Sequence, residues 1–237
     1  MSFTEFQKTV NLSKQRIYSE AFAQYRQSIR VKKEMTAVKN LSRIFDATLR
    51  ISNKKGFPSM TMRDLSRETG LSMGALYTCF SSKEDLLEML QRQGRLIVDR
   101  FLKQATEAET EPRAKLNGAV KTHLYLSEAM QPWFYFSYME AKNLTKKQAK
   151  MAVDSELYTE QVFLDILNEG QERGVFVPRD YRLMASLIKA MVQDWYLKRR
   201  KYAKRQVSVD QYADFVLALV EAFCLAPQEV TTLNQEE

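Results

Sequence analysis

The chain has 237 residues with a formal net charge of +7; 45% are hydrophobic and 11% aromatic, and only 7 Gly and 5 Pro are present. Its length allows one large or two small domains with a real core, and the scarcity of turn residues disfavours a β-rich fold. No apolar run approaches the roughly 18–20 residues of a membrane span, and the N-terminus lacks an apolar signal segment. We therefore expect an all-α protein that does not enter a membrane. Cys79 and Cys224 stand far apart, outside any metal-ligand spacing, so we also expect a reduced, cytoplasmic setting with no metal or cofactor.

The positive charge is concentrated at the front of the chain. Residues 1–55 contain 12 Lys and Arg against 4 Asp and Glu, a net +8, whereas residues 93–237 contain 20 of each kind. A basic end joined to a neutral body indicates contact between that end and a polyanion. From charge alone, a solvated basic surface is the alternative.

Residues 1–35 form a polar extension dotted with aromatic side chains. Its apolar residues recur at helical spacing, which predicts an amphipathic helix: Ile17, Tyr18, Ala21, Phe22, Tyr25 and Ile29. The extension ends in the basic residues Arg30, Lys32 and Lys33. Together with Lys39 they either follow phosphates or enter a minor groove, as basic arms do, or are only solvated. The sequence leaves both readings open.

Residues 36–82 read as three helices. A helix spans Thr36–Lys55 and stops at Gly56; Thr61 caps a short helix, Met62–Thr69, which Gly70 ends. Ser72 caps the next helix, which runs to about Phe80, and Ser82 caps a long helix that begins at Lys83. Two short helices joined by a Gly-containing turn are typical of a helix-turn-helix motif.

A helical wheel divides the helix after Ser72 into two halves. Ala75, Leu76, Cys79 and Phe80 fall on the half expected to pack inward, and the other half carries Met73, Gly74, Tyr77 and Thr78. An exposed half so poor in charge indicates that something docks there.

Residues 83–237 read as a larger helical domain. The expected helices are 83–106, 112–130, 132–142, 144–173, 179–204 and 208–225. Prolines near the starts of several of these segments fit the first turn of a helix.

At this point the motifs match a known family. Residues 36–90 contain IFDATL (Ile44–Leu49), then Lys55–Phe57, then TMRDLSRETGLSMGALYTCFSSKEDLL (Thr61–Leu87). This region resembles the DNA-binding domain of TetR-family transcriptional regulators, and no single element carries the resemblance. The remainder resembles the family in length and helical layout, with Glu169–Asp180 similar to the junction before the family's last two helices.

The chain departs from the family's pattern at three places. Cys79 stands where the family usually has Tyr or His, and its place on the inward half of the wheel indicates packing rather than a redox switch. Ser66 replaces the commoner Ala, and the N-terminal extension is longer than usual.

The resemblance implies that the helix after Ser72 enters the major groove. Gly74 would let the backbone approach DNA, while Tyr77 and Lys83 would contact phosphates, and Met73 would read thymine methyl groups. The complete set of candidate DNA-binding residues is Lys39, from the basic arm, together with Thr61, Arg63, Ser72, Met73, Gly74, Ala75, Tyr77, Thr78 and Lys83. Ordinary surface is the alternative for Arg63 and Met73, and Thr61 is expected to cap its helix in either case.

The resemblance also implies a homodimer through residues 179–225, which would match a palindromic double-stranded DNA operator. The sequence supports this surface because the final helix is apolar over more than one face. The residues concerned include Leu183, Leu187, Tyr212, Phe215 and Leu219.

An effector cavity is implied in the helical body. Its expected wall is Pro132–Lys142, whose aromatic residues cover nearly all helix faces, and the ligand expected there is apolar, aromatic or amphipathic. The candidate ligand-binding residues are His123, Trp133, Phe134, Phe136, Tyr138, Met191 and Trp195, with Tyr125, Tyr158 and Met184 as possible neighbours. Plain core packing is the alternative for each of them. The basic run Lys198–Arg205 would suit the phosphates of an acyl-coenzyme A, or only the C-terminal end of its helix.

These observations predict a ligand-responsive regulator, most simply a repressor, whose effector acts through the long helix starting at Lys83. A helix-turn-helix regulator controlled by a protein partner is the alternative. An enzyme is disfavoured because the chain has one His and no Gly-rich phosphate loop, HExxH or GxSxG motif. A sequence-independent DNA-coating protein is disfavoured because a neutral body adds nothing to phosphate binding.

Overall fold

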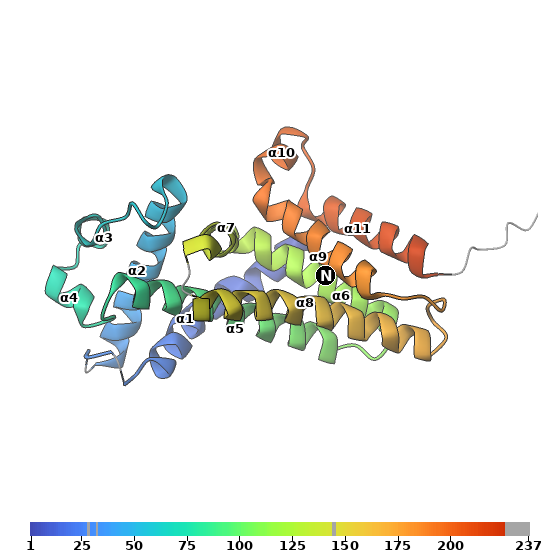
Figure 1. The fold of residues 1–237 in the computed structure, drawn as a ribbon, viewed down its shortest axis with the longest axis horizontal. Coiled ribbons are helices and arrows are strands. Elements are labelled where there is room, and N and C mark those ends of the chain that lie inside the picture. The colour runs from blue at the N-terminus through green and yellow to red at the C-terminus, as the bar shows by residue number, and fades with distance from the viewer. Residues whose placement is uncertain (28, 32, 144–145, 226–237) are drawn as a thin grey trace, which may run out of the picture.

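The computed structural model describes residues 1–27, 29–31, 33–143 and 146–225, without the side chains of 9–15, 147–148 and 151–152. Within these ranges the chain forms only helices, which confirms the predicted fold class (Figure 1). The N-terminal elements are α1 (Phe3–Gln24), α2 (Glu34–Lys55), α3 (Met62–Thr69) and α4 (Met73–Tyr77). The others are α5 (Lys83–Glu107), α6 (Pro112–Ala129), α7 (Gln131–Met139), the 3-10 helix η1 (Ala141–Asn143), α8 (Lys146–Glu172), α9 (Arg182–Leu197), α10 (Arg199–Lys204) and α11 (Val209–Cys224). No helix in the described part of the chain is long and apolar enough to cross a membrane.

Helices α2, α3 and α4 lie together at one end of the elongated molecule, and the other helices form the body (Figure 1). Leu65 of α3 and Leu76 of α4 are fully buried, as are Leu41, Ile44 and Phe45 on one face of α2. Burial of these apolar side chains holds two helices of eight and five residues that would not be stable alone.

Two of the expected helical segments differ from the structure in their bounds. The segment expected as 132–142 stops at Met139, where Glu140 becomes the C-cap and η1 follows. The segment expected as 179–204 begins at Arg182 and breaks at Lys198 into α9 and α10. The break lets α10 fold back, so that Tyr202 stacks on Trp195 with 5.1 Å between ring centroids.

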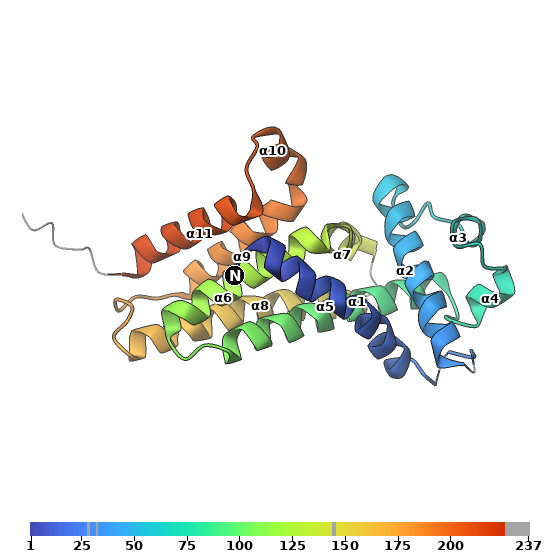
Figure 2. The ribbon, with the colours of Figure 1, turned by 180° about the vertical axis from the view of Figure 1, so that it is seen from behind.

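Helix α1 lies along the body and reaches α2 (Figure 2). Near its beginning, the backbone N–H of Phe3 donates to Oδ1 of Asp210 in α11 at 3.1 Å. Toward its end, the hydroxyl of Tyr18 donates to Oδ1 of Asp46 in α2 at 2.9 Å, and Nε2 of Gln93 in α5 donates to the carbonyl of Ile17. The expected amphipathic helix is therefore present, and it joins the body to the end formed by α2, α3 and α4.

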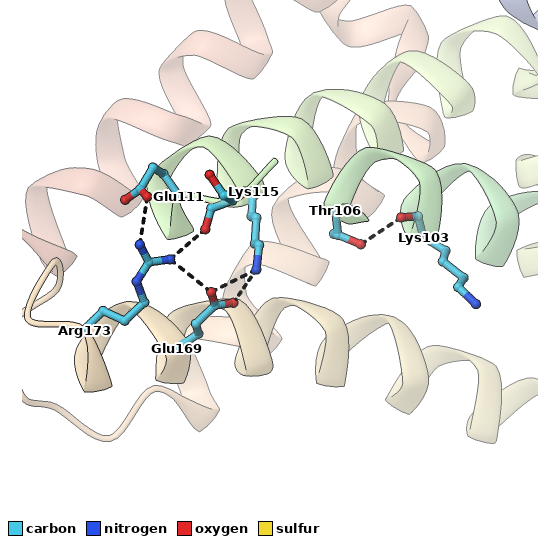
Figure 3. Close-up of polar contacts among 7 residues, drawn as sticks. Lys103, Thr106, Glu111, Lys115, Glu169 and Arg173 are labelled. Atoms are coloured by element: carbon cyan, nitrogen blue, oxygen red, sulfur yellow. Dashed lines mark hydrogen bonds and ion pairs between the residues drawn. The ribbon is translucent and has the colours of Figure 1, made fainter. Parts of the chain in front are cut away.

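The end of the body farthest from α4 is held by ion pairs (Figure 3). Nζ of Lys115 in α6 lies 2.7 Å from Oε2 of Glu169 in α8, and Arg173 contacts both Glu169 and Glu111. These pairs lie near the surface, where each stabilises the fold by about 1 kcal/mol at most. Their role is to fix the start of α6 against the end of α8.

Candidate functional site

A capping box sets the start of α3. Oγ1 of Thr61 accepts from the backbone N–H of Asp64 at 3.1 Å, and Oδ2 of Asp64 accepts from the N–H of Thr61 at 3.0 Å. Lys55, which donates to Asp64 at 2.6 Å, is the main cause holding the pKa of that carboxyl below its usual range. The last residues of α2 and the first turn of α3 are thereby tied together.

Helix α4 presents the two halves that the wheel predicts. Leu76 is buried, whereas Met73 and Tyr77 are 38% and 44% exposed, and Gly74 is also exposed. The helix is shorter than expected, because Oγ1 of Thr78 donates to the carbonyl of Ala75 at 2.6 Å and closes its last turn. Beyond that turn, Cys79 and Phe80 are buried, as predicted.

Nothing in the fold requires a glycine at position 74. A Cβ built there would have Oγ of Ser72 as its nearest neighbour, at 4.0 Å, and the backbone φ is not positive. The bare backbone therefore faces open space on the exposed half of α4. This is the arrangement that the close approach of a DNA backbone would use.

Lys83 stands at the start of α5 in a more enclosed position than the sequence suggests. Its Nζ donates to the carbonyl of Pro58 at 2.8 Å and lies 4.9 Å from the ring centroid of Phe57. Burial lowers the pKa of the Lys83 ammonium. A phosphate contact by this side chain would have to replace or share the contact with Pro58.

The basic residues before and within α2 are exposed where the structure describes them. Arg30, Lys33, Lys39 and Arg63 all have exposed side chains, and Lys32 lies outside the described residues. The backbone N–H of Arg30 donates to the carbonyl of Thr78 at 2.8 Å. This bond brings the basic segment against the end of α4.

A cavity of about 640 Å³ lies in the body between helices α5 to α9. Four of the seven predicted ligand-binding residues line it: His123, Trp133, Phe134 and Tyr138. Sequence reasoning missed other lining residues, including Arg92, Gly94, Arg95, Lys189 and Tyr196, whereas Lys142 belongs to the expected wall. The volume is in the range of pockets for small organic ligands.

The other three predicted ligand-binding residues lie outside the cavity lining. Phe136 packs on Phe57 with 5.9 Å between ring centroids. Trp195 donates from Nε1 to Glu128 at 2.9 Å and lies among tyrosines of α10 and α11, and the carbonyl of Met191 accepts from one of those tyrosines. The helical wheel of an aromatic-rich segment identifies buried side chains but does not say which neighbour buries them.

The basic run Lys198–Arg205 is also outside the cavity lining, and several of its cations are engaged elsewhere. Lys198 and Lys201 both pair with Asp194, and Arg199 pairs with Glu128 at 2.7 Å. These contacts brace the turn between α9 and α10.

Two buried basic side chains, His123 and Lys189, line the cavity and interact electrostatically. His123 in α6 is 1% exposed, and Lys189 in α9 is 9% exposed. Burial, and then the charge of Lys189, hold the pKa of His123 well below its usual range. Burial lowers the pKa of Lys189, while Glu156 and Glu160 act in the opposite direction.

Helix α7 joins the cavity wall to α2. Nδ2 of Asn53 in α2 donates to the carbonyl of Pro132 at 2.8 Å, and the ring of Phe45 meets that of Trp133 edge-on at 5.9 Å. Trp133 also lines the cavity. The sequence predicts that an effector acts on the DNA-binding end through α5. The structure adds a direct contact between α7 and α2 that the sequence did not reveal.

Two family models match the chain. The model described as bacterial regulatory proteins, tetR family, matches residues 44–90, and the model described as tetracyclin repressor-like, C-terminal domain, matches residues 109–220. The first covers α3 and α4, and the second covers most of the helices around the cavity.

Curated relatives and solved structures agree with these matches. HbdR of Aromatoleum sp. is 22% identical over 77% of this chain and 80% of its own length, and the repressor KstR2 of Mycobacterium tuberculosis is 28% identical over 69% and 84%. The KstR2 structure superposes with a TM-score of 0.68 and 19% identity over 84% of this chain and 99% of its own.

Two solved structures similar to this chain contain acyl-coenzyme A ligands. FadR of Bacillus subtilis, in complex with stearoyl-CoA, superposes with a TM-score of 0.62 and 17% identity, over 75% of this chain and 96% of its own. AibR, in complex with isovaleryl coenzyme A and operator DNA, gives 0.66 and 16% over 76% and 97%. Matched along both its DNA-binding end and its helical body, the chain belongs to the TetR family of bacterial transcriptional regulators.

Proposed function

We propose that this regulator is a dimeric repressor which binds a palindromic operator through α3 and α4 and is released by a small effector in the body cavity. The observation that carries the proposal is that α7 borders both the cavity and α2. Its Trp133 lines the cavity, and the ring of Trp133 contacts Phe45 of α2. A ligand that moves α7 therefore acts directly on α2, the helix against which α3 packs, and α3 in turn packs on α4.

The exposed half of α4 supports DNA binding. Met73, Gly74 and Tyr77 form an uncharged exposed surface, and the exposed cations Arg30 and Arg63 belong to neighbouring segments. Uncharged contacts to base edges flanked by cations on phosphates are the usual division of labour in a major groove.

Exposed apolar side chains of α9 and α11 support dimerisation. Leu183 and Leu187 are 78% and 56% exposed, and Phe215 and Leu219 are 68% and 50% exposed. Each pair is spaced by four residues and so shares one face of its helix, and α9 and α11 pack on each other. An apolar surface of this kind is costly in water and fits a second copy of the chain.

The proposal is tested by titrating the protein into labelled DNA of the region upstream of its own gene. We expect salt-dependent binding that protects an inverted repeat from nuclease digestion, with one protomer on each half-site. A ligand that lowers DNA affinity must itself bind more weakly to the DNA complex, by the same factor. Equal affinity for the inverted repeat and for random DNA, at every salt concentration, contradicts the proposal.

A further inference from the structure

The cavity contains a buried ammonium group whose charge is not compensated by a close contact. Lys189 is 9% exposed and lines the cavity. Among the residues that the structure describes, no carboxylate forms an ion pair with it within 4.0 Å. A buried charge is costly unless an opposite charge or several hydrogen bonds compensate it.

The two carboxylates that act on the charge of Lys189, Glu156 and Glu160, are already hydrogen-bonded to other side chains. Oε1 of Glu156 accepts from Nε2 of Gln193 at 3.0 Å, and Oε2 of Glu160 accepts from Oγ of Ser186 at 2.7 Å. They favour the charged form of Lys189 from a distance without pairing with it. The chain thus leaves a direct partner for this nitrogen to be supplied from outside.

A second polar group lies at the same wall. His123 is 1% exposed and lines the cavity, and its buried Nδ1 has no hydrogen-bond partner within the described part of the chain. Buried polar atoms of native proteins are nearly always satisfied. A ligand oxygen, or a water molecule held between ligand and ring, would satisfy this nitrogen.

Aromatic rings continue directly from this polar corner. The ring of His123 meets that of Phe134 edge-on at 5.7 Å, and Phe134 meets Tyr196 at 5.2 Å. All three side chains line the cavity together with Trp133. A ligand held at Lys189 would therefore lay its body on an aromatic wall.

We propose that the effector is an apolar carboxylic acid whose carboxylate pairs with Lys189, beside His123, and whose hydrocarbon or aryl body lies against Phe134, Tyr196 and Trp133. This inference rests on the proposed function and names the chemical class of its ligand. A free carboxylate supplies the missing opposite charge. An ester or a coenzyme A thioester of the same acid offers only a neutral carbonyl at that position.

The test uses the full-length protein and a series of fatty acids and arylalkanoic acids, each beside its methyl ester and its coenzyme A thioester. Binding is measured by calorimetry and by the shift in melting temperature. We expect the best acid to bind about 10- to 100-fold more tightly than its ester and its thioester, as loss of a charged hydrogen-bonding partner predicts. Failure of every acid to bind, or equal binding of acid and ester, overturns the proposal.

Lys189→Met should abolish the preference for the acid and should raise the melting temperature of the ligand-free protein, because it removes an uncompensated buried charge. Lys189→Gln is a second, uncharged variant should the first not fold. Lys142→Met is the matched control, because Lys142 also lines the cavity but is exposed, and it should keep the preference. A preference for acids that survives both changes at Lys189 overturns the proposal.

Operator binding separates this inference from the proposed function. Release of DNA by thioesters but not by acids leaves the proposed function intact and overturns the assignment of the ligand class. Tight, Lys189-dependent binding of an acid that leaves DNA affinity unchanged supports the ligand class and contradicts effector control.

Discussion

The backbone N–H of Phe57, in the turn after α2, donates a 2.9 Å hydrogen bond to Oε1 of Glu140, the residue that ends α7. Glu140 is 5% exposed and Phe57 is 4% exposed, so the bond is shielded from water. It joins the turn leading into α3 to the helix that carries the cavity wall. We therefore expect a change in the position of α7 to alter the position of the turn that leads into α3.

Replacing Glu140 with Ala should leave the Phe57 N–H unsatisfied and lower the free energy of unfolding by about 1–3 kcal/mol. It should also weaken the coupling between effector and operator, measured as the ratio of DNA affinities with and without ligand. Glu140→Gln keeps an oxygen acceptor and should preserve most of the coupling. Full coupling in the Ala variant would show that the signal does not pass through this bond.

Replacing Lys83 with Ala should flatten the plot of log affinity for DNA against log salt concentration by about one unit, because one phosphate contact is lost. The loss should be equal for operator and random DNA, since phosphates carry no sequence code. Lys103→Ala is the control, an exposed lysine near the other end of α5. An unchanged slope for the Lys83 variant would mean that its only partners are Pro58 and Phe57.

Replacing Gly74 with Ala should weaken operator binding while leaving the fold intact. The added Cβ meets nothing nearer than 4.0 Å within the protein, and Ala favours a helix over Gly by up to about 1 kcal/mol. Thermal unfolding should show equal or higher stability, and DNA titration should show lower affinity. Unaltered affinity would remove the backbone of α4 from the DNA contact.

Replacing Gly94 with Ala should have the opposite effect on stability. A Cβ at this position of α5 would lie 2.7 Å from Nε1 of Trp133, which donates to the carbonyl of Leu90. Displacing this indole should cost about 1–3 kcal/mol of unfolding free energy, as overpacking usually does. If Gly94→Ala unfolds with the same free energy as Gly74→Ala, the indole of Trp133 can shift in the cavity without cost.

Replacing Leu219 with Glu should weaken the dimer by at least about 2 kcal/mol, or roughly 30-fold, because a charge would enter an apolar interface. Sedimentation velocity gives the oligomeric state, and circular dichroism checks the fold. Leu96→Glu, a change at another exposed leucine of the body, should leave the dimer intact. A folded Leu219 variant that dimerises as tightly as the parent would exclude this surface.

Most of the helix boundaries in the DNA-binding end could be predicted from interactions between residues close in the sequence. The caps at Thr61, Ser72 and Ser82 all accept the expected backbone N–H groups, because capping depends on neighbours within four residues. The wheel of α4 was confirmed for the same reason. Its final turn was not foreseen, since the hydroxyl of Thr78 competes with the helix for a carbonyl.

The cavity was predicted only in part, because its walls come from distant segments. Lys189 lies in an apolar helix, where a sequence reading assigns it to the surface, and its burial depends on how α6 and α8 pack around it. Phe136 and Trp195 are buried as expected, but by neighbours outside the cavity. Periodicity identifies the buried face of a helix and does not identify the space that it borders.

Helix α1 limits the ways in which the two ends of this regulator can move. Its 22 residues form a rod about 33 Å long, anchored near one end to Asp210 and near the other to Asp46. A rod fixed at both ends resists changes in the distance between its anchors but permits twisting about its own axis. A body transplanted onto another DNA-binding end would lose the bond between Tyr18 and Asp46, which belongs to α2, even if this rod were carried with it.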